Sequence, residues 1–580
     1  MVPAYPAQDA ADSARDADPG PGALVLVASN RGPVSYALAS PPPRSPSRTA
    51  PGGSDAASAP EPRPSPRSAA SPEPPALTAR RGGGGLVSGL SAIGADAQAV
   101  WVCAALGDGD REAVRQAAAR AGAGAGDGAD TARSAAPDAA GGRAGALLDT
   151  ADTGGQRVRM LDIEPEVFAA AYNGVANSVL WFVHHLLYQT PLEPSFDADF
   201  ARQWAAYEAY NGAFADALAR EAAPGAAVLV QDYHLTLVPA LLRERRPDLR
   251  IGHFSHTPWA PPDYYRMLPD DVAEAVLRGI LGGDRAGFLT ARWAEAFADC
   301  CARVLGARVG RDTASGELTV ELDGRTTRLG VHGLGADAEF LRARSRAADV
   351  AERRDALRAQ IDGGPTGADA PAAGGVEGGE GGRKVIVRVD RTELSKNIVR
   401  GLHAYRRLLT DRPQWRERVV HVAFAYPSRQ DLAVYREYTQ EVRRVAEEIN
   451  EAFGTPGWQP VVLHVKDDFA RSLAAYRIAD VALVNPIRDG MNLVAKEVPV
   501  ISEAGCALVL SREAGAYAEL GEDALTVNPY DVEATARALH EALSMDPAER
   551  AARTKRLAKA ATALPPREWF LAQLRALGAT

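Results

Sequence analysis

Short, continuously apolar runs recur along the chain, and each is followed by polar or glycine-containing residues. Runs of this kind are typical of strands buried on both faces of a parallel sheet, and the segments between them carry helical patterns. Alternating strands and helices predict an α/β protein. The runs lie at residues 23–29, 99–103, 227–231, 250–255, 326–332, 384–389, 420–424, 461–465, 481–484, 507–510 and 524–527.

The runs form two groups, which predicts two doubly wound, Rossmann-like domains facing a cleft. A chain of 580 residues is also too long for one ordinary core. Low-complexity stretches without periodicity are expected to be disordered, and the glycine-rich linker before Lys384 is expected to permit domain rotation. We predict a disordered N-terminus (1–22), a first domain (23–344, with insertions at about 37–80 and 121–156), a linker (345–383), a second domain (384–555) and a C-terminal helix (556–580) that crosses back to the first domain.

Composition narrows the classes of partner. The net charge of -9 argues against the excess of basic residues that binding nucleic acid requires. No apolar run reaches membrane-spanning length. The four cysteines form no C-x-x-C pair, which argues against a zinc site or a disulfide framework and suits a reducing cytoplasm. The N-terminus shows no secretory signal pattern, so we expect a cytoplasmic protein, with a homo-oligomer left open.

The stretch 485–497 carries the strongest candidate chemistry. It follows the run 481–484, turns at Gly490 and opens a helix at about Asn492. The free N–H groups and positive dipole of a helix N-terminus bind anions, and carboxylates such as Asp489 and Glu497 accept hydrogen bonds from sugar hydroxyls. This combination predicts the donor site of an enzyme that uses a nucleotide sugar. The alternative is a sheet turn with one solvated acid and one capping acid.

Three cations follow strands of the second domain. Arg391 and Lys396 lie on the connection after the run 384–389, and Arg429 lies past the run 420–424. Open α/β sheets bind ligands at the carboxyl ends of their strands. Arg391 and Lys396 are therefore predicted to neutralise a diphosphate leaving group, with an exposed surface pair as the alternative.

Comparable positions occur in the first domain. Arg31 follows the first run and predicts a phosphate or carboxylate clamp, with a surface arginine as the alternative. Asp232 and His256 end two successive runs, whereas His253 is expected to face the opposite side and only to pack. The glycines of 82–85 would let the backbone approach a ligand. Tyr172 and Trp181 are nine positions apart, which does not place them on one α-helical stripe.

These motifs resemble glycosyltransferase family 20, the trehalose-6-phosphate synthases, over about residues 23–575 apart from the low-complexity insertions. The most specific segment is Asp489-Gly-Met-Asn-Leu-Val-Ala-Lys-Glu497; the others are Ser-Asn-Arg31, Gly-Gly-Leu86, Asp-Tyr-His234, His256-x-Pro and Ser-Arg429. The resemblance implies the GT-B fold and transfer of glucose from GDP- or UDP-glucose to glucose 6-phosphate. It also implies retention at the anomeric carbon, with neither metal nor cofactor.

The resemblance also implies a role for each matching residue. Asp232, His256, Arg391, Lys396 and Asp489 would be catalytic. The donor would contact Gly84, Gly85, Arg391, Lys396, Asp489, Leu493, Val494 and Glu497. The acceptor would contact Arg31, Tyr172, Trp181, Asp232 and Arg429.

Two positions depart from the family pattern. Ala104 replaces the second tryptophan of the usual Trp-x-Gly-Trp, and Asn397 replaces the glycine of the usual Arg-Leu-Asp-Tyr-Ser-Lys-Gly. Both changes resemble the actinobacterial branch of the family. They leave two alternatives open: a pseudo-glycosyltransferase that couples an activated cyclitol to an aminocyclitol phosphate, and a non-catalytic sugar-phosphate sensor.

Overall fold

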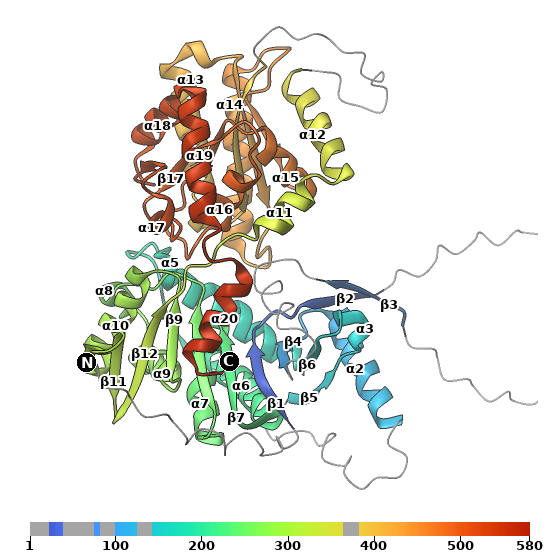
Figure 1. The fold of residues 1–580 in the computed structure, drawn as a ribbon, viewed down its shortest axis with the longest axis vertical. Coiled ribbons are helices and arrows are strands. Elements are labelled where there is room, and N and C mark those ends of the chain that lie inside the picture. Colours follow the sequence, from blue (N-terminus) through green and yellow to red (C-terminus); the bar gives the residue numbers. More distant parts are fainter. Residues whose placement is uncertain (1–21, 39–74, 82–98, 124–141, 364–381, 580) are drawn as a thin grey trace, which may run out of the picture.

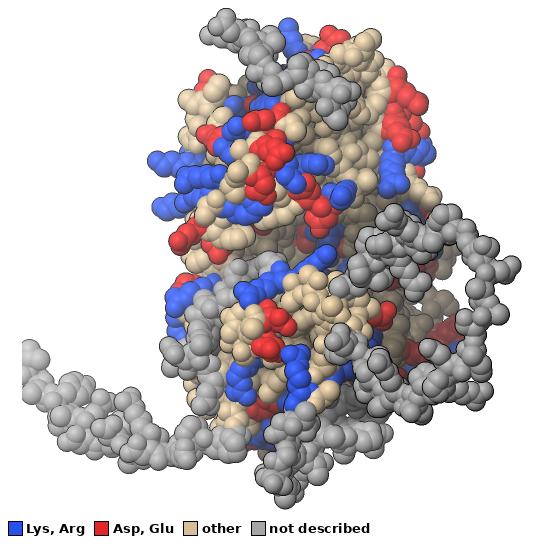
Figure 2. Space-filling view, turned by 90° about the vertical axis from the view of Figure 1, so that its right-hand side faces the viewer, with Lys and Arg blue, Asp and Glu red and all other residues tan. Residues whose placement is uncertain are grey.

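Two lobes, each built on its own sheet, are stacked along the long axis of the molecule (Figure 1). A computed structural model describes residues 22–38, 75–81, 99–123, 142–363 and 382–579. Gly84, Gly85 and most of the predicted disordered segments lie outside these ranges. Within them, no helix has the length and apolarity that crossing a membrane requires. On the face drawn in Figure 2, basic and acidic side chains are intermingled over both lobes.

The lower lobe contains a ten-stranded sheet. Its central strands run parallel in the order β6-β4-β1-β7-β8-β9, which is 3-2-1-4-5-6 when they are numbered along the chain. In such a sheet the strand order reverses at one point, here between β1 and β7, and ligands bind outside the carboxyl ends of the strands there. Its strands are β1 (Ala23–Ala28), β4 (Ala99–Ala104), β5 (Gly142–Leu147), β6 (Arg157–Ile163), β7 (Ala222–Gln231), β8 (Arg250–Ser255), β9 (Arg285–Phe288), β10 (Arg308–Arg311), β11 (Leu318–Leu322) and β12 (Arg325–Val331).

Helices cover this sheet and connect its strands. Most of them bury an apolar stripe, as α9 does with Val272, Val276 and Ile280. They are α2 (Asp108–Ala123), α3 (Thr150–Thr153), α4 (Pro165–Ala169), the π-helix η2 (Ala170–Leu180), α5 (Trp181–His185), α6 (Ala198–Glu221), the 3₁₀ turn η3 (Tyr233–Leu235), α7 (Val238–Arg245), α8 (Pro262–Tyr265), α9 (Asp270–Leu281) and α10 (Ala291–Leu305).

The upper lobe repeats the same strand order in a six-stranded, fully parallel sheet. Its order, β15-β14-β13-β16-β17-β18, is again 3-2-1-4-5-6 along the chain, so its order reverses between β13 and β16. The strands are β13 (Lys384–Arg391), β14 (Val419–Tyr426), β15 (Val461–His464), β16 (Val481–Val484), β17 (Ala507–Ser511) and β18 (Leu525–Val527). The helices are α11 (Ala338–Ser345), α12 (Ala348–Ile361), η4 (Leu394–Lys396), α13 (Ile398–Asp411), η5 (Pro413–Trp415), α14 (Ala433–Phe453), α15 (Phe469–Ile478), α16 (Leu493–Ile501), α17 (Tyr517–Leu520), α18 (Val532–Ser544) and α19 (Pro547–Ala561).

The chain passes from the lower to the upper lobe before α11 (Ala338–Ser345), which is earlier than the domain boundary expected at residue 344. Helices α11 and α12 lie on the upper lobe, against α16 and α15 (Figure 1). The sequence of helix α12 is rich in charged residues. The helix nevertheless buries Val350, Leu357 and Ile361, and this apolar stripe packs it against the upper lobe. The chain therefore crosses between β12 and α11, and the glycine-rich stretch before Lys384 lies within the upper lobe. We propose that the segment 332–337 is the hinge.

Two segments predicted as disordered contain regular structure. Strand β3 (Leu77–Arg81) pairs antiparallel with β2 (Val34–Leu38), and β5 and α3 fall within 121–156. The hairpin is attached to α3, because the Tyr36 hydroxyl donates to Asp152 (3.1 Å) and Arg81 donates to the Ala151 carbonyl (2.8 Å). Long-range polar contacts of this kind leave no periodic signal in the sequence, which explains why the prediction missed these elements.

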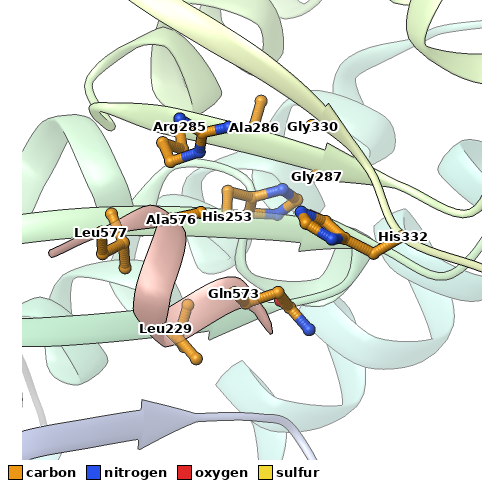
Figure 3. Close-up of a pocket in the computed structure, with 11 residues that line it drawn as sticks. Leu229, His253, Arg285, Ala286, Gly287, Gly330, His332, Gln573, Ala576 and Leu577 are labelled. Carbon is orange, nitrogen blue, oxygen red and sulfur yellow. The ribbon is translucent and has the colours of Figure 1, made fainter. Parts of the chain in front are cut away.

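The last helix, α20 (Pro566–Ala576), returns to the lower lobe (Figure 1). The indole of Trp569 is fully buried, donates to the His332 carbonyl (3.1 Å) and meets the Phe254 ring edge-on. Figure 3 shows Gln573 and Ala576 of α20, with Leu577 just past its end, over the sheet beside a small pocket that His253 also lines. His253 also contacts the Asp232 carbonyl through Nε2 (3.2 Å), so it supports the backbone of a predicted site residue.

Candidate active site

The points of strand reversal in the two sheets meet across one cavity of about 700 Å³. Both lobes line it, and direct hydrogen bonds join them around it. A cavity of this size is in the range that holds a small ligand. Its lining residues are Ser29, Asn30, Arg31, Tyr172, Asn173, Trp181, Gln231, Asp232, Tyr233, His234, His256, Arg391, Pro427, Ser428, Arg429, Gln430 and Asp431.

Asp232 and His256 lie together at the carboxyl ends of β7 and β8. Asp232 has a left-handed backbone (φ 73°), and its carboxylate accepts from the His256 N–H (3.1 Å). Burial raises the pKa of Asp232, while His256 and Arg429 oppose that shift. Burial also lowers the pKa of His256, whose Nε2 pairs with Gln231 (2.9 Å). The pair thus presents a carboxyl group beside a neutral imidazole, two groups that bind sugar hydroxyls well.

Tyr172 and Trp181 both line the cavity, although α-helical spacing would place them on opposite faces. The reason is η2, a π-helix over Ala170–Leu180. Its i→i+5 hydrogen bonds give a wider turn, so positions nine apart return to nearly the same face. The sequence pattern could not distinguish this helix from an α-helix. Tyr172 stacks on His234 (5.5 Å between ring centroids), and Trp181 stacks on His185 (3.8 Å).

Arg429 joins the two lobes. Its backbone is left-handed (φ 48°), and its guanidinium lies 3.9 Å from the centre of the Trp181 ring. From the upper lobe it donates to Asn177 (3.1 Å) and to the Tyr233 hydroxyl (3.2 Å), both of the lower lobe. The stacking and these two hydrogen bonds to neutral groups hold the guanidinium at the junction of the two lobes.

Glu393, which the sequence analysis missed, is the anionic partner of two site arginines. Its side chain is fully buried and lies 3.2 Å from Arg391 and 3.2 Å from Arg429. Burial acts to raise its pKa, but the two arginines and Lys396 outweigh burial and hold the pKa at about 2. The signal that could have revealed it is its place between the two predicted cations, Arg391 and Lys396.

Lys396 and Asp489 meet at the point of strand reversal in the upper sheet. Their side chains form an ion pair (2.6 Å), and Asn492 donates to the same carboxylate oxygen (3.0 Å). Burial works to lower the pKa of Lys396, but Asp489 and other carboxylates raise it, so the ammonium stays charged. This arrangement fixes one cation and one anion at the place where doubly wound sheets bind their ligands.

Asn397, one of the departures from the family pattern, has a structural explanation. It has a left-handed backbone (φ 60°), a conformation that glycine adopts freely and asparagine tolerates. Its amide also donates to the carbonyls of Asn485 (2.9 Å) and Pro529 (2.7 Å). The substitution thus keeps the turn and adds two hydrogen bonds that hold neighbouring loops. Ala104, the other departure, is buried at the end of β4.

The first turn of α16 contains Leu493 and Val494, and Glu497 lies one turn further. Asn492 caps this helix by accepting from the Ala495 N–H (3.2 Å). N–H groups in a first helical turn lack partners within the helix and favour anions. Burial raises the pKa of Glu497 to about 7, although a hydrogen bond from the Tyr476 hydroxyl opposes the shift.

We propose that Glu497 binds the donor nucleotide, and its raised pKa then predicts that the affinity for the nucleotide depends on pH. The carboxylate accepts hydroxyl hydrogen bonds better than the neutral acid, so affinity should rise with pH through about 7. If binding requires the ionised form of a group with this pKa, the affinity at pH 6 is about tenfold lower than at pH 8. Titration calorimetry with UDP measures this, and Glu497→Gln should remove the dependence. A wild-type dependence that persists in the variant would assign it to another group.

Gly490 lies where the two lobes approach each other closely. A Cβ added there would lie 1.8 Å from the His256 carbonyl oxygen of the lower lobe. Trp293 of the lower lobe donates to the Gly490 carbonyl (3.3 Å), and Arg488 stacks over the Trp293 ring (4.4 Å). The absence of a side chain at Gly490 therefore allows the loop after β16 to reach His256.

The structure brings most of the predicted site residues together. Seven of them line the cavity: Arg31, Tyr172, Trp181, Asp232, His256, Arg391 and Arg429. Lys396 and Asp489 lie in the loops after β13 and β16, and Leu493, Val494 and Glu497 lie on α16. Gly84 and Gly85 lie outside the described residues. Besides Glu393, the sequence analysis missed His185, which is buried within electrostatic reach of Asp489.

Comparisons with known proteins agree with the GT-B fold class. Residues 71–368 and 376–578 match the model of glycosyltransferase family 20. The trehalose-6-phosphate synthase of Mycolicibacterium paratuberculosis is 35% identical over 428 residues, which are 72% of this chain and 81% of that protein. A bifunctional trehalose-6-phosphate synthase/phosphatase of Thermoproteus tenax is 34% identical over 410 residues, which are 69% of this chain but only 51% of that protein.

A solved structure is similar over most of its length. It is an α,α-trehalose-phosphate synthase (UDP-forming) from Burkholderia xenovorans in complex with glucose-6-phosphate. The two chains are 28% identical, with a TM-score of 0.64, and the match covers 73% of this chain and 87% of the other. The prediction of two doubly wound domains in the GT-B arrangement is confirmed.

Proposed function

Because this chain belongs to glycosyltransferase family 20, we propose that it transfers glucose from UDP-glucose to glucose 6-phosphate, forming α,α-trehalose 6-phosphate. The observation that carries the proposal is the Lys396–Asp489 pair, which lies at the point of strand reversal in the upper sheet, next to a cavity lined by Arg31, Asp232 and Arg429. We favour UDP over GDP because the similar Burkholderia protein is described as UDP-forming.

On the donor side, Arg391, Lys396 and the first turn of α16 would bind the diphosphate. Charge grows on the diphosphate as its bond to the sugar breaks, so fixed cations lower the barrier. Asp489 would accept a hydrogen bond from a glucose hydroxyl, and His256 would accept from or donate to another. Glu497 would accept from the ribose hydroxyls. Leu493 and Val494 would contribute backbone N–H groups.

On the acceptor side, Arg31 and Arg429 would bind the phosphate, between the rings of Tyr172 and Trp181. Asp232 would orient the acceptor hydroxyl. That hydroxyl attacks the anomeric carbon on the face from which the diphosphate leaves; a new C–O bond forms, the bond to the diphosphate breaks, and the diphosphate takes the proton. This path retains the anomeric configuration without an enzyme nucleophile.

Analysis of the product tests the proposal. The purified protein with UDP-glucose and glucose 6-phosphate should yield a disaccharide phosphate whose ¹H NMR spectrum shows two α-anomeric protons. A β-linked product, or glucose released to water, would contradict it. The cyclitol-coupling and sensor alternatives are not favoured, because the relatives described above carry the names of sugar-transferring enzymes.

Replacing Arg429 with alanine tests the acceptor assignment. We expect the KM for glucose 6-phosphate to rise about a hundredfold, because a buried charge-assisted contact to phosphate is lost. The Kd for UDP should stay within about threefold. The exposed Arg444→Ala on α14 is the matched control, because Arg444 pairs only with Glu441 and Glu448 of its own helix among the described residues. Loss of UDP binding in Arg429→Ala would show that the acceptor assignment is wrong.

We also propose a cytoplasmic location. Cys103, Cys300, Cys301 and Cys506 are free, buried thiols, which suits a reducing compartment.

A further inference from the structure

One buried carboxylate oxygen connects the proposed donor and acceptor sites. Glu393 Oε1 lies 3.2 Å from Arg391 Nε and 3.2 Å from Arg429 Nη1, and it accepts from the Ser428 hydroxyl (3.0 Å). The side chain of Glu393 is wholly buried, whereas that of Arg391 is 58% exposed. The two arginines that would each bind a different substrate phosphate thus share one anion.

The second oxygen of this carboxylate has no partner within the described part of the chain. Glu393 Oε2 is buried and without a hydrogen bond there. A buried carboxylate is costly unless it is fully paired, so a purely structural role would favour contacts to both oxygens. The pairing is confined to Oε1, the oxygen that faces the arginines.

An anion at this position opposes the binding of substrates. Both proposed ligands carry phosphate groups. The protein interior screens charges poorly, so a carboxylate in contact with the arginines repels these phosphates. It also occupies N–H groups that would otherwise reach phosphate oxygens. Arg429 shows this most clearly, because three of its other four N–H groups already contact Asn177, Tyr233 and Tyr435.

We propose that Glu393 is a positioning residue that competes with both phosphates for Arg391 and Arg429. It holds the two guanidiniums in place while the site is empty, and it limits the affinity for nucleoside diphosphate and sugar phosphate so that products leave. The proposal rests on the assignment of the two arginines under the proposed function.

The test is the affinity of Glu393→Gln for each ligand alone. Glutamine keeps the size of the side chain and removes its charge, so we expect UDP and glucose 6-phosphate each to bind about tenfold more tightly by titration calorimetry. The value of kcat should fall, because release becomes slower. General damage to the site would weaken binding, so the gain in affinity distinguishes competition from mere support.

A second variant keeps the test decisive if the glutamine variant folds poorly, which thermal melting would reveal. Glu393→Asp keeps the charge but shortens the side chain, so it reaches the two arginines less well. Its affinities should lie between those of wild type and the glutamine variant. Glu437→Gln is the charge control, because Glu437 is an exposed residue of α14 and is not among the residues that line the cavity; the affinities of this variant should change less than twofold.

Weaker binding of both ligands by either Glu393 variant would overturn the proposal. Equal tightening by Glu437→Gln would also overturn it, because the effect would then come from net charge alone. A different measurement tests the proposed function. If that function is wrong, the wild-type protein forms no disaccharide phosphate, and this result does not depend on how the affinities of the variants rank.

Discussion

Replacing Lys396 with methionine is expected to lower kcat about a thousandfold while the KM for glucose 6-phosphate changes little. Lys396 carries a mostly buried ammonium (side chain 14% exposed) 2.6 Å from Asp489, at the place proposed for the departing diphosphate. A fixed charge that stabilises a developing anion contributes most in the transition state, so its loss appears mainly in kcat. Methionine preserves the length of the side chain, and steady-state kinetics with varied acceptor measure both constants.

A double variant separates catalysis from stability in this experiment. Lys396→Met leaves Asp489 buried without its cation, which should lower the melting temperature. Adding Asp489→Asn removes the unpaired charge, so stability should recover while turnover stays low. If Lys396→Met kept more than a tenth of wild-type kcat, the charge would not act on the leaving group.

Gly490→Ala is expected to lower kcat/KM at least about a hundredfold. The added Cβ would lie 1.8 Å from the His256 carbonyl oxygen, a backbone atom that cannot move aside alone. The loop after β16 would therefore shift, carrying Asp489 away from His256, and misplacement by about 1 Å can reduce catalysis about a hundredfold. Kinetics with UDP-glucose would show the loss, and a melting curve would show modest destabilisation from overpacking.

Gly212→Ala provides the matched control. Gly212 lies within helix α6, its added Cβ would meet no heavy atom within 4 Å, and its φ is not positive. Alanine there should leave kcat/KM unchanged and stabilise the helix by up to about 1 kcal/mol. Full activity in Gly490→Ala would show that the two lobes do not need this close approach.

The sequence was sufficient to locate the polar residues at the carboxyl ends of buried strands. Asp232, His256, Lys396 and Asp489 could be assigned to one cleft because strand ends in doubly wound sheets meet at the point of strand reversal. The apolar runs identify the strands, and the residue that follows each run identifies the ligand edge. This inference needs only local pattern and a topological rule.

Features that depend on contacts between distant residues could not be predicted in this way. The π-helix that places Tyr172 and Trp181 on one face cannot be recognised from the spacing of apolar residues in the sequence. Glu393 could not be singled out from the sequence, because its contacts to Arg429 and Ser428 come from another loop. Glycine content indicates local freedom only, so it could not reveal that α12 belongs to the upper lobe, because the packing of α12 against α15 is a tertiary contact.

The most direct test of the account measures nucleoside diphosphate release by purified protein. UDP-, GDP- and ADP-glucose would each be supplied with and without glucose 6-phosphate. We predict UDP release from UDP-glucose that requires glucose 6-phosphate. Release that does not depend on the acceptor, or no release with any of the three donors, would contradict the proposal that this chain transfers glucose to a sugar phosphate.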